Sequence, residues 1–397
     1  MKIFIRLLII SIGLFFTVAC SSNGVALKNE EENTPSKAKV EEVVEEEKPT
    51  HKEITISAIG DLLYHTSVYE DAETSEGHDF TPMLADVEAY LSESTITFAN
   101  QETMIGGVEH GLSSYPSFNS PKEAGDALKE VGVDVVSIAN NHTLDRGEPV
   151  IQSSIKHWED LDMTYVGAYK NQEDKEKLRI IETDEGITVA FLAYTYGTNG
   201  IPIPEGKEYL VNLIDRENIK EEIERANKEA DVTLLSLHFG EEYQPYPSDE
   251  QKDLVQFAAD HGVHAVIGHH PHVLQPIEWV EGDDGHETLV IYSLGNFLSG
   301  QNEIPRQIGG MFNFTIKQTI ADDTIEVISP KFLPTFVSYD VVDGKRVNYN
   351  VTPMHKITDE DLPNSKKKYE ETVKHMNQWL PELEIIKSED ELINEEF

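Results

Sequence analysis

The sequence predicts an α/β sandwich, because short apolar strands and amphipathic helices alternate through the middle of the chain. The clearest strand is residues 133–139, which begins with the β-branched run 133–136, broken only by Asp134, and stops at Asn140 and Asn141. The 397 residues are 39% hydrophobic, enough to bury one large core or two ordinary ones. In open α/β sheets ligands bind at the carboxyl ends of strands, so residues that follow each strand are functional candidates.

Hydrophobic periodicity assigns the elements of the first half of the domain. A helix over residues 80–91 begins at Thr81-Pro82 and repeats apolar residues at helical spacing, and another over 121–131 begins with proline. A third helix is predicted over 152–161. The strands expected in this half are residues 54–59, 95–99, 133–139 and 163–166.

The same alternation continues in the second half. The strands expected here are residues 187–193, 231–237, 264–267 and 289–294, and the helices are residues 219–230 and 251–261. Further strands near 310–316, 324–328 and 331–337 are expected to complete a second sheet. The domain is therefore assigned to residues 53–345. The acidic residues 346–397, with a helix over 365–380, are interpreted as a peripheral appendage.

The N-terminus resembles a bacterial lipoprotein signal. Lys2 and Arg6 precede an apolar run over residues 7–18. The end of this run overlaps the sequence Thr17-Val18-Ala19-Cys20. Cleavage would remove residues 1–19 and leave Cys20 lipidated; an uncleaved anchor is the alternative, although the run is short for a spanning helix of roughly 20 residues. Both interpretations place the chain at the extracytoplasmic face of the bacterial cell membrane. Cys20 is the only cysteine, so an intramolecular disulfide is excluded.

Residues 20–52 are polar, with acidic clusters at 41–42 and 45–47, and contain too few large apolar residues to fold alone. We interpret them as a disordered acidic linker between the membrane and the domain. The whole chain carries 73 acidic against 32 basic residues, a net charge of -41. Such a charge repels phosphate backbones, which argues against a nucleic acid as partner.

Five predicted strand ends carry residues able to bind a metal. Each has an ordinary explanation by itself, such as a turn residue, a solvated charge or a semi-buried histidine, but five in one chain indicate a site. Carboxylates and imidazoles without thiolates suit one or two ions of Mn, Fe or Zn. An extended backbone would direct His270 and His272 to one side, and a nearby histidine could protonate a leaving group. The candidates are Asp61, Glu102, Asn141, His142, His238, His270 and His272.

Four motifs resemble the signature blocks of the CapA family of poly-γ-glutamate capsule biosynthesis proteins. They are residues 140–147 (NNHTLDRG), 238–243 (HFGEEY), 268–272 (GHHPH) and 292–297 (YSLGNF), and the resemblance covers roughly residues 54–339. It implies a four-layer αββα sandwich similar to metallophosphoesterases, with the site at the strand ends.

The resemblance also implies roles for individual residues, with His142 as the catalytic proton donor. The implied metal ligands are Asp61, Glu102, Asn141, His238, His270 and His272. The implied site-lining positions are Asn100, Asp145, Arg146, Glu242, Tyr243, His269 and Asn296.

Two positions depart from the metallophosphoesterase pattern. The metallophosphoesterase pattern has Asp-x-His on its first strand, but Leu63 stands at the histidine position and the next histidine is His65. The pattern also has Gly-Asp after the second strand, where this chain has Glu102.

We expect a surface-anchored protein acting in synthesis, export or anchoring of poly-γ-glutamate through a metal-dependent hydrolase-like site. A non-catalytic scaffold or polymer-binding subunit of a membrane synthase is one alternative, and an extracellular metal-dependent phosphoesterase is another. The expected partners are membrane-bound synthase or export subunits and an anionic polymer or phosphoester.

Overall fold

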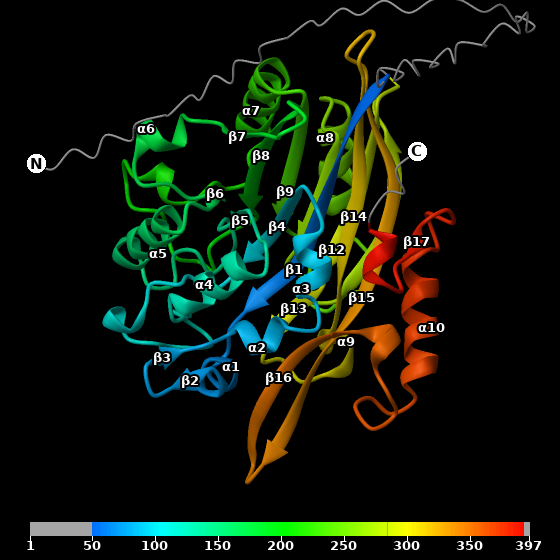
Figure 1. The fold of residues 1–397 in the computed structure, drawn as a ribbon. Coiled ribbons are helices and arrows are strands. Elements are labelled where there is room, and N and C mark those ends of the chain that lie inside the picture. The colour runs from blue at the N-terminus through cyan, green and yellow to red at the C-terminus, as the bar shows by residue number, and fades with distance from the viewer. Residues whose placement is uncertain (1–49, 284, 393–397) are drawn as a thin grey trace, which may run out of the picture. The chain divides into compact units, whose positions relative to one another are not determined.

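Two mixed β-sheets lie face to face in the computed structural model, which describes residues 50–283 and 285–392 (Figure 1). The strands of the first sheet are β1 (His51–Leu63), β4 (Ile96–Gln101), β5 (Val135–Ser137), β6 (Thr164–Val166), β13 (Asn296–Ser299), β14 (Ile308–Thr319), β15 (Ile325–Val342), β16 (Lys345–Pro353) and β17 (Glu384–Ile385). They run in the order β16-β15-β14-β1-β4-β5-β6, with β13 paired to β1 and β17 to β15. In this sheet β1, β4, β5 and β6 are parallel, whereas β14 is antiparallel to β1.

The second sheet follows the order β11-β12-β10-β9-β8-β7. Its strands are β7 (Arg179–Glu182), β8 (Thr188–Thr195), β9 (Val232–His238), β10 (Ala265–His269), β11 (Leu274–Glu281) and β12 (Glu287–Leu294). The central strands β8, β9, β10 and β12 are parallel. A small separate hairpin pairs β2 (Glu73–Thr74) with β3 (Gly77–His78).

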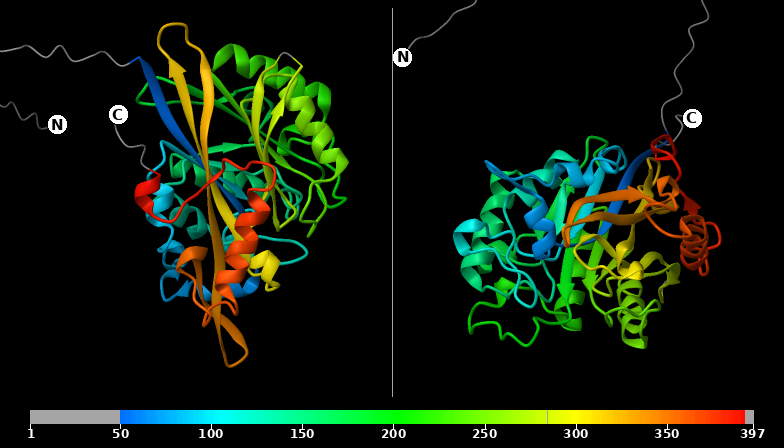
Figure 2. Two further views of the ribbon diagram at one scale, coloured as in Figure 1. Left: turned by 90° about the vertical axis from the view of Figure 1, so that its right-hand side faces the viewer. Right: turned by 90° about the horizontal axis from the view of Figure 1, so that it is seen from below.

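Side-chain alternation along β8 shows how the layers are built. Val189, Phe191 and Ala193 face the interior cluster between the sheets. The Phe191 ring stacks there on the ring of Phe98 from β4, with centroids 6.0 Å apart. Leu192 and Tyr194 face the other way and pack with α7 (Arg216–Glu229) and α8 (Asp249–Ala259). Helices therefore cover the face of the second sheet that points away from the first (Figures 1 and 2).

The first sheet is covered beside β4–β6 by α4 (Glu123–Glu130) and α5 (Glu148–Asp160). Trp158 of α5 is completely buried, and α4 approaches it closely at Gly125, where a Cβ atom would lie 2.8 Å from the indole ring. With helices outside both sheets, the predicted α/β sandwich is confirmed. The shorter helices are α1 (Thr66–Asp71), α2 (Thr81–Leu84), α3 (Glu88–Ser92), α6 (Gln172–Lys175) and α9 (Ile304–Gln307).

Some element predictions are wrong in detail. The helix predicted over 80–91 divides into α2 and α3, and the strands predicted over 324–328 and 331–337 form the single strand β15. The strands after residue 308 do not complete the second sheet; β14 pairs with β1 from His51 to Ile59, so they extend the first. Only non-local packing decides this, because β1 offers an edge on each side and β14 occupies the edge that β4 leaves free.

The C-terminal residues are not the peripheral appendage that we expected. Strand β16 pairs with β15, so a boundary after residue 345 would cut a hairpin. Helix α10 (Ser365–Met376) contacts β11 of the second sheet and β15 of the first, and Met376 and Leu380 are buried in the interior cluster. At the other end, β1 begins at His51, within the range predicted as linker.

Several predictions fall outside the described residues. The lipoprotein signal, Cys20 and nearly all of the predicted linker precede residue 50. Among the residues that are described, the helices are all too short or too polar to span a bilayer.

Because α10 is partly buried, we expect its core residues to contribute to the free energy of unfolding. Replacing Met376, which is 0% exposed, by Ala should lower the free energy of unfolding by about 2–5 kcal/mol, because it leaves a cavity in the core. Urea denaturation measures the change, and Glu370→Ala on the exposed side of the same helix is the matched control. Equal stabilities for the two variants would contradict an integral role for this helix.

Candidate metal centre

The carboxyl ends of parallel strands from both sheets meet at one place in the molecule. Asp61 lies near the end of β1, Glu102 directly follows β4, and Asn141 comes shortly after β5. The second sheet contributes the histidines at the ends of β9 and β10. The predicted ligands are all at most 3% exposed: Asp61, Glu102, Asn141, His238, His270 and His272.

Asp61 stands at the centre of this cluster. The Asn100 side chain donates to Asp61 Oδ1 at 2.8 Å, His272 Nδ1 lies 3.1 Å from Oδ2, and the backbone N–H of His270 donates to Oδ2 at 3.3 Å. His269 Nδ1 is 3.2 Å from Oδ1. Burial alone would favour the neutral acid, but His269 and His272 hold the pKa of Asp61 well below its ordinary value. Asp61 is therefore an ionised anchor that several site residues share.

Glu102 is the most unusual group in the cluster. It is completely buried, and neither carboxylate oxygen has a hydrogen-bond partner. His238 Nε2 and His272 Nε2 lie 3.6 and 3.7 Å from Oε1, too far for hydrogen bonds. Burial raises the pKa of Glu102 well above its ordinary value. A buried carboxylate without partners is costly, and a cation held between it and the histidines would satisfy it.

Two of the three histidines next to Glu102 are in the chemical form that binds metals, whereas Glu102 and Asp61 outweigh the effect of burial and raise the pKa of the third, His272, to about 9. Burial lowers the pKa of His238 well below its ordinary value and that of His270 to about 3, so both rings are neutral. His238 Nε2 lies 2.8 Å from Asn141 Oδ1, and the His238 and His270 rings are 4.9 Å apart. One ligand atom each from Glu102, His270 and His272 lies within 4.8 Å of the others, which fits a divalent metal site.

The backbone of the His-Pro-His segment differs from our expectation. It is not extended: φ is 98° at His270 and 57° at His272, in the left-handed region that non-glycine residues rarely adopt. The two rings nevertheless converge, with centroids 5.9 Å apart. Asp61 binds the N–H of His270 and the ring of His272, which shows how this strained turn is held.

His142 is oriented by a separate set of contacts. Its Nδ1 lies 2.7 Å from Asp145 Oδ2, and its ring packs edge-on against Phe118 with centroids 4.7 Å apart. The same Asp145 oxygen accepts the backbone N–H of Phe118 at 2.8 Å. Because Nδ1 is engaged, Nε2 is the atom left free for proton transfer.

Two residues of this region were missed in the sequence. Asn199 Oδ1 accepts from Asn141 Nδ2 at 3.2 Å while its Nδ2 lies 3.4 Å from His142 Nδ1, so it links a metal ligand to the candidate acid. The Tyr196 ring lies 4.7 Å from that of His270. Both residues follow β8, and the polar stretch after this apolar strand was the available signal.

The remaining predicted site residues are not all brought together. Asn296 Oδ1 lies 3.1 Å from His272 Nδ1, and the Tyr243 ring is 6.1 Å from that of His272, beneath the guanidinium of Arg306. Glu242 is exposed beside Tyr243. Arg146 instead donates to the backbone oxygens of His110 and Gly111, and so holds a neighbouring loop.

Leu63 stands where the metallophosphoesterase pattern has a histidine, and the nearby His65 does not take over the role of that histidine. Its Nδ1 lies 3.0 Å from the Leu63 carbonyl oxygen, and its ring packs on Phe118 at 5.2 Å. Burial lowers the pKa of His65 to about 4. The Asp61 end of the centre therefore draws its nitrogen donors from His269 and His272.

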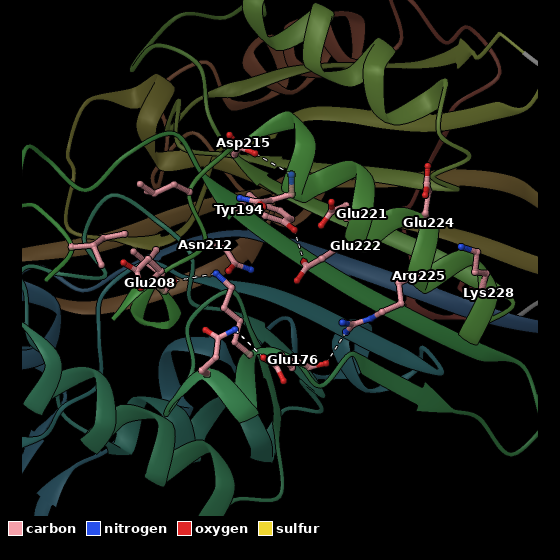
Figure 3. Close-up of a pocket in the computed structure, with 16 residues that line it drawn as sticks. Glu176, Tyr194, Glu208, Asn212, Asp215, Glu221, Glu222, Glu224, Arg225 and Lys228 are labelled. Atoms are coloured by element: carbon pink, nitrogen blue, oxygen red, sulfur yellow. Dashed lines mark hydrogen bonds between the residues drawn. The ribbon is translucent and has the colours of Figure 1, made fainter. Parts of the chain in front are cut away.

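A cavity of about 770 Å³ lies elsewhere, beside α6 and α7 (Figure 3). Its carboxylates outnumber its cations, and Tyr194 donates to Glu222 within it. Such a lining disfavours an anionic ligand. The acidic lining residues are Glu176, Glu208, Asp215, Glu221, Glu222 and Glu224, against Lys175, Arg225 and Lys228.

The fold and the site together define an α/β protein with a buried carboxylate–histidine centre suited to a divalent metal. The sequence profile of the family described as "Bacterial capsule synthesis protein PGA_cap" matches residues 55–301, more than half of the chain. The chain belongs to this family.

Two curated relatives resemble the chain over part of their length. The "PGA biosynthesis protein CapA" of Bacillus subtilis is 30% identical over 207 residues, which cover 50% of each chain. The "Capsule biosynthesis protein CapA" of Bacillus anthracis is 27% identical over 261 residues, 63% of this chain and 61% of that protein. The chain thus spans about half to three fifths of these relatives. A crystal structure titled as a novel phosphatase from Mycoplasma pneumoniae is a remote likeness, with a TM-score of 0.42 and 13% identity over 72% of this chain and 94% of that one.

Because the Glu102 carboxylate has no hydrogen-bond partner, we expect it to bind a metal ion. After reconstitution with Mn, Fe or Zn, the protein should retain about one or two ions per chain, and the metal should raise its Tm. Glu102→Gln and the double variant His270→Ala, His272→Ala should lose both effects, because they remove ligands. Elemental analysis after dialysis and thermal melts measure the two effects.

The matched control is His51→Ala, an exposed histidine on the far end of β1. A wild-type protein that retains no metal after reconstitution, or variants that retain as much as the wild type, would contradict the site.

Proposed function

We propose that this chain is a surface-anchored capsule biosynthesis protein that acts on poly-γ-glutamate, in its synthesis, export or anchoring, through a metal-dependent hydrolase-type centre of metallophosphatase-like design. The family, and the names of the two CapA relatives, support the capsule role. The observation that carries the enzymatic part is the buried Glu102 carboxylate, which has no hydrogen-bond partner and lies beside the neutral rings of His238 and His270. Anchoring at Cys20 to the outer face of the membrane, and partnership with membrane-bound synthase or export subunits, belong to the same proposal.

The residues around Glu102 contact one another in two pairs. His272 contacts Asp61, and His238 contacts Asn141, while the ring of His270 lies close to those of His238 and His272. One or two divalent ions bound by them would polarise an anionic substrate and make water a nucleophile at neutral pH. Asn199 fixes the Asn141 amide so that its oxygen faces His238, and Asn100 keeps Asp61 in place.

His142 supplies the proton that a leaving group needs. Asp145 holds its Nδ1 and Phe118 packs against its ring, so the imidazole is fixed with Nε2 available. The His142 side chain lies beside Asn141 and is only 6% exposed, so most water is kept away from the proton transfer. In a hydrolysis, Nε2–H would pass to the oxygen or nitrogen of the departing group.

Leu63 favours a second candidate function, a non-catalytic scaffold that grips the polymer or the synthase. The residue two after Asp61 offers no nitrogen, and His65 does not replace it. In this case the centre would hold the fold or the polymer without turnover. An extracellular phosphoesterase with another substrate is the third candidate, supported by the same His142–Asp145 pair.

The first test of the enzymatic proposal is His142→Ala. Turnover of a chromogenic phosphoester or of the polymer should fall by about 10²–10⁴-fold, because a positioned acid is lost. Bound metal should stay at the wild-type level, since His142 is not among the proposed ligands. Steady-state kinetics and elemental analysis give the two readings, and an unchanged rate would remove the acid role.

The second test distinguishes an enzyme from a scaffold in cells. Deleting the gene should abolish surface poly-γ-glutamate, and the wild-type gene should restore it. A scaffold would still restore polymer with His142→Ala, whereas an enzyme would not. Polymer measured by immunoassay gives the answer once the variant is shown to accumulate normally. Unchanged polymer in the deletion strain would contradict the capsule role itself.

A further inference from the structure

A cavity of about 550 Å³ lies between α1 and the tip of the β15–β16 hairpin. Both elements can be followed in Figure 1. The hairpin tip places two consecutive cations, Lys345 and Arg346, at its wall. The opposite wall comes from the segment that follows β1. The lining residues used below are His65, Ser67, Glu70, Asp71, Lys345 and Arg346.

The hairpin is fixed against α1 by several hydrogen bonds. Asp71 accepts the backbone N–H groups of Asn348 and Tyr349, both at 2.8 Å. The hydroxyl groups of Ser67 and Tyr349 are 2.7 Å apart. These contacts fix the backbone of the hairpin beside α1 before any ligand arrives, which lowers the entropic cost of binding at its tip.

The cavity is lined by two cations, Lys345 and Arg346, and by two acidic residues, Glu70 and Asp71. Arg346 donates to the Gly300 carbonyl oxygen and stacks over the Tyr339 ring, with its Cζ atom 5.4 Å from the centroid. Neither Lys345 nor Arg346 has an ion pair within 4.0 Å in the part of the chain that the structure describes. Of the two acidic residues, Asp71 is occupied by backbone N–H groups and Glu70 is exposed.

The cavity adjoins the metal centre through aromatic contacts. His65 lines it, and the His65 ring lies 5.2 Å from that of Phe118, which lies 4.7 Å from His142. On the other side, Gly300 follows β13, whose first residue Asn296 contacts His272. The hairpin lies beyond residue 301, where the family match ends.

We propose that Lys345 and Arg346 form an oxyanion-binding subsite that holds an anionic group of the substrate while a neighbouring part of the same molecule reaches the metal centre. The inference rests on the proposed function, because it describes how that centre would choose its substrate. A guanidinium binds carboxylate or phosphate through paired hydrogen bonds, and an ammonium adds a point charge. A chain of net charge -41 repels polyanions in general, so local unpaired cations decide where one can bind.

The test measures binding of a fluorescein-labelled oligomer of γ-linked glutamate to the full-length protein at low salt. The double variant Lys345→Gln, Arg346→Gln should weaken the Kd by roughly 10-fold or more, the loss expected when charged hydrogen bonds disappear. The matched control is Lys366→Gln, Lys367→Gln, which removes two adjacent exposed cations from α10. Competition by glutarate and by inorganic phosphate identifies the preferred oxyanion.

A selective loss in the hairpin variant, with stronger competition by glutarate, assigns the subsite to carboxylates, and stronger competition by phosphate assigns it to phosphates. An unchanged Kd in the hairpin variant, or an equal loss in the control, would overturn the subsite. A wild-type protein that binds none of the probes would also overturn the subsite. These outcomes are separate from the proposed function, which depends on retained metal and on His142 in cells.

Discussion

Asp61 carries a carboxylate that is buried where the ends of the two sheets meet, and much of the site is arranged around it. Its two oxygens bind the Asn100 amide, the His272 ring and the N–H of His270. The last two contacts hold a turn whose φ angles are positive at both histidines. Strain of this kind persists only when the surroundings determine it, and here one ionised side chain contacts both histidines of the turn. Its neighbour Asn296 pairs with it across β1 and β13 and also reaches His272.

Glu102 is the complement of Asp61. The two carboxylates are both completely buried, yet one is satisfied by hydrogen bonds and the other has none. The pKa of Asp61 is lowered and that of Glu102 is raised, so the environment separates two acids of similar intrinsic strength. Two acids whose pKa values are shifted in opposite directions are typical of functional centres, and a buried carboxylate without hydrogen bonds is costly in a core built for stability alone.

The segments after residue 301 belong to the folded domain. Helix α10 contacts β11 of the second sheet and β15 of the first, and the β15–β16 hairpin is hydrogen-bonded to α1. The family match over residues 55–301 includes the residues of the centre, and the hairpin that follows it contributes Lys345 and Arg346 to the cavity of the proposed subsite.

The sequence by itself determined the α/β class, most strand positions and the residues at the strand ends, because local periodicity and the chemistry of Asp, Asn and His side chains are visible in any sequence. Tertiary structure alone decided that β14 joins β1, that β16 and α10 belong to the domain, and that Asn199 and Tyr196 reach the centre. It also separated Arg146 from the other predicted site residues and replaced an extended His-Pro-His segment by a strained turn. The physical reason is that strand partners and side-chain contacts between distant segments depend on packing of the whole core. No local pattern encodes them.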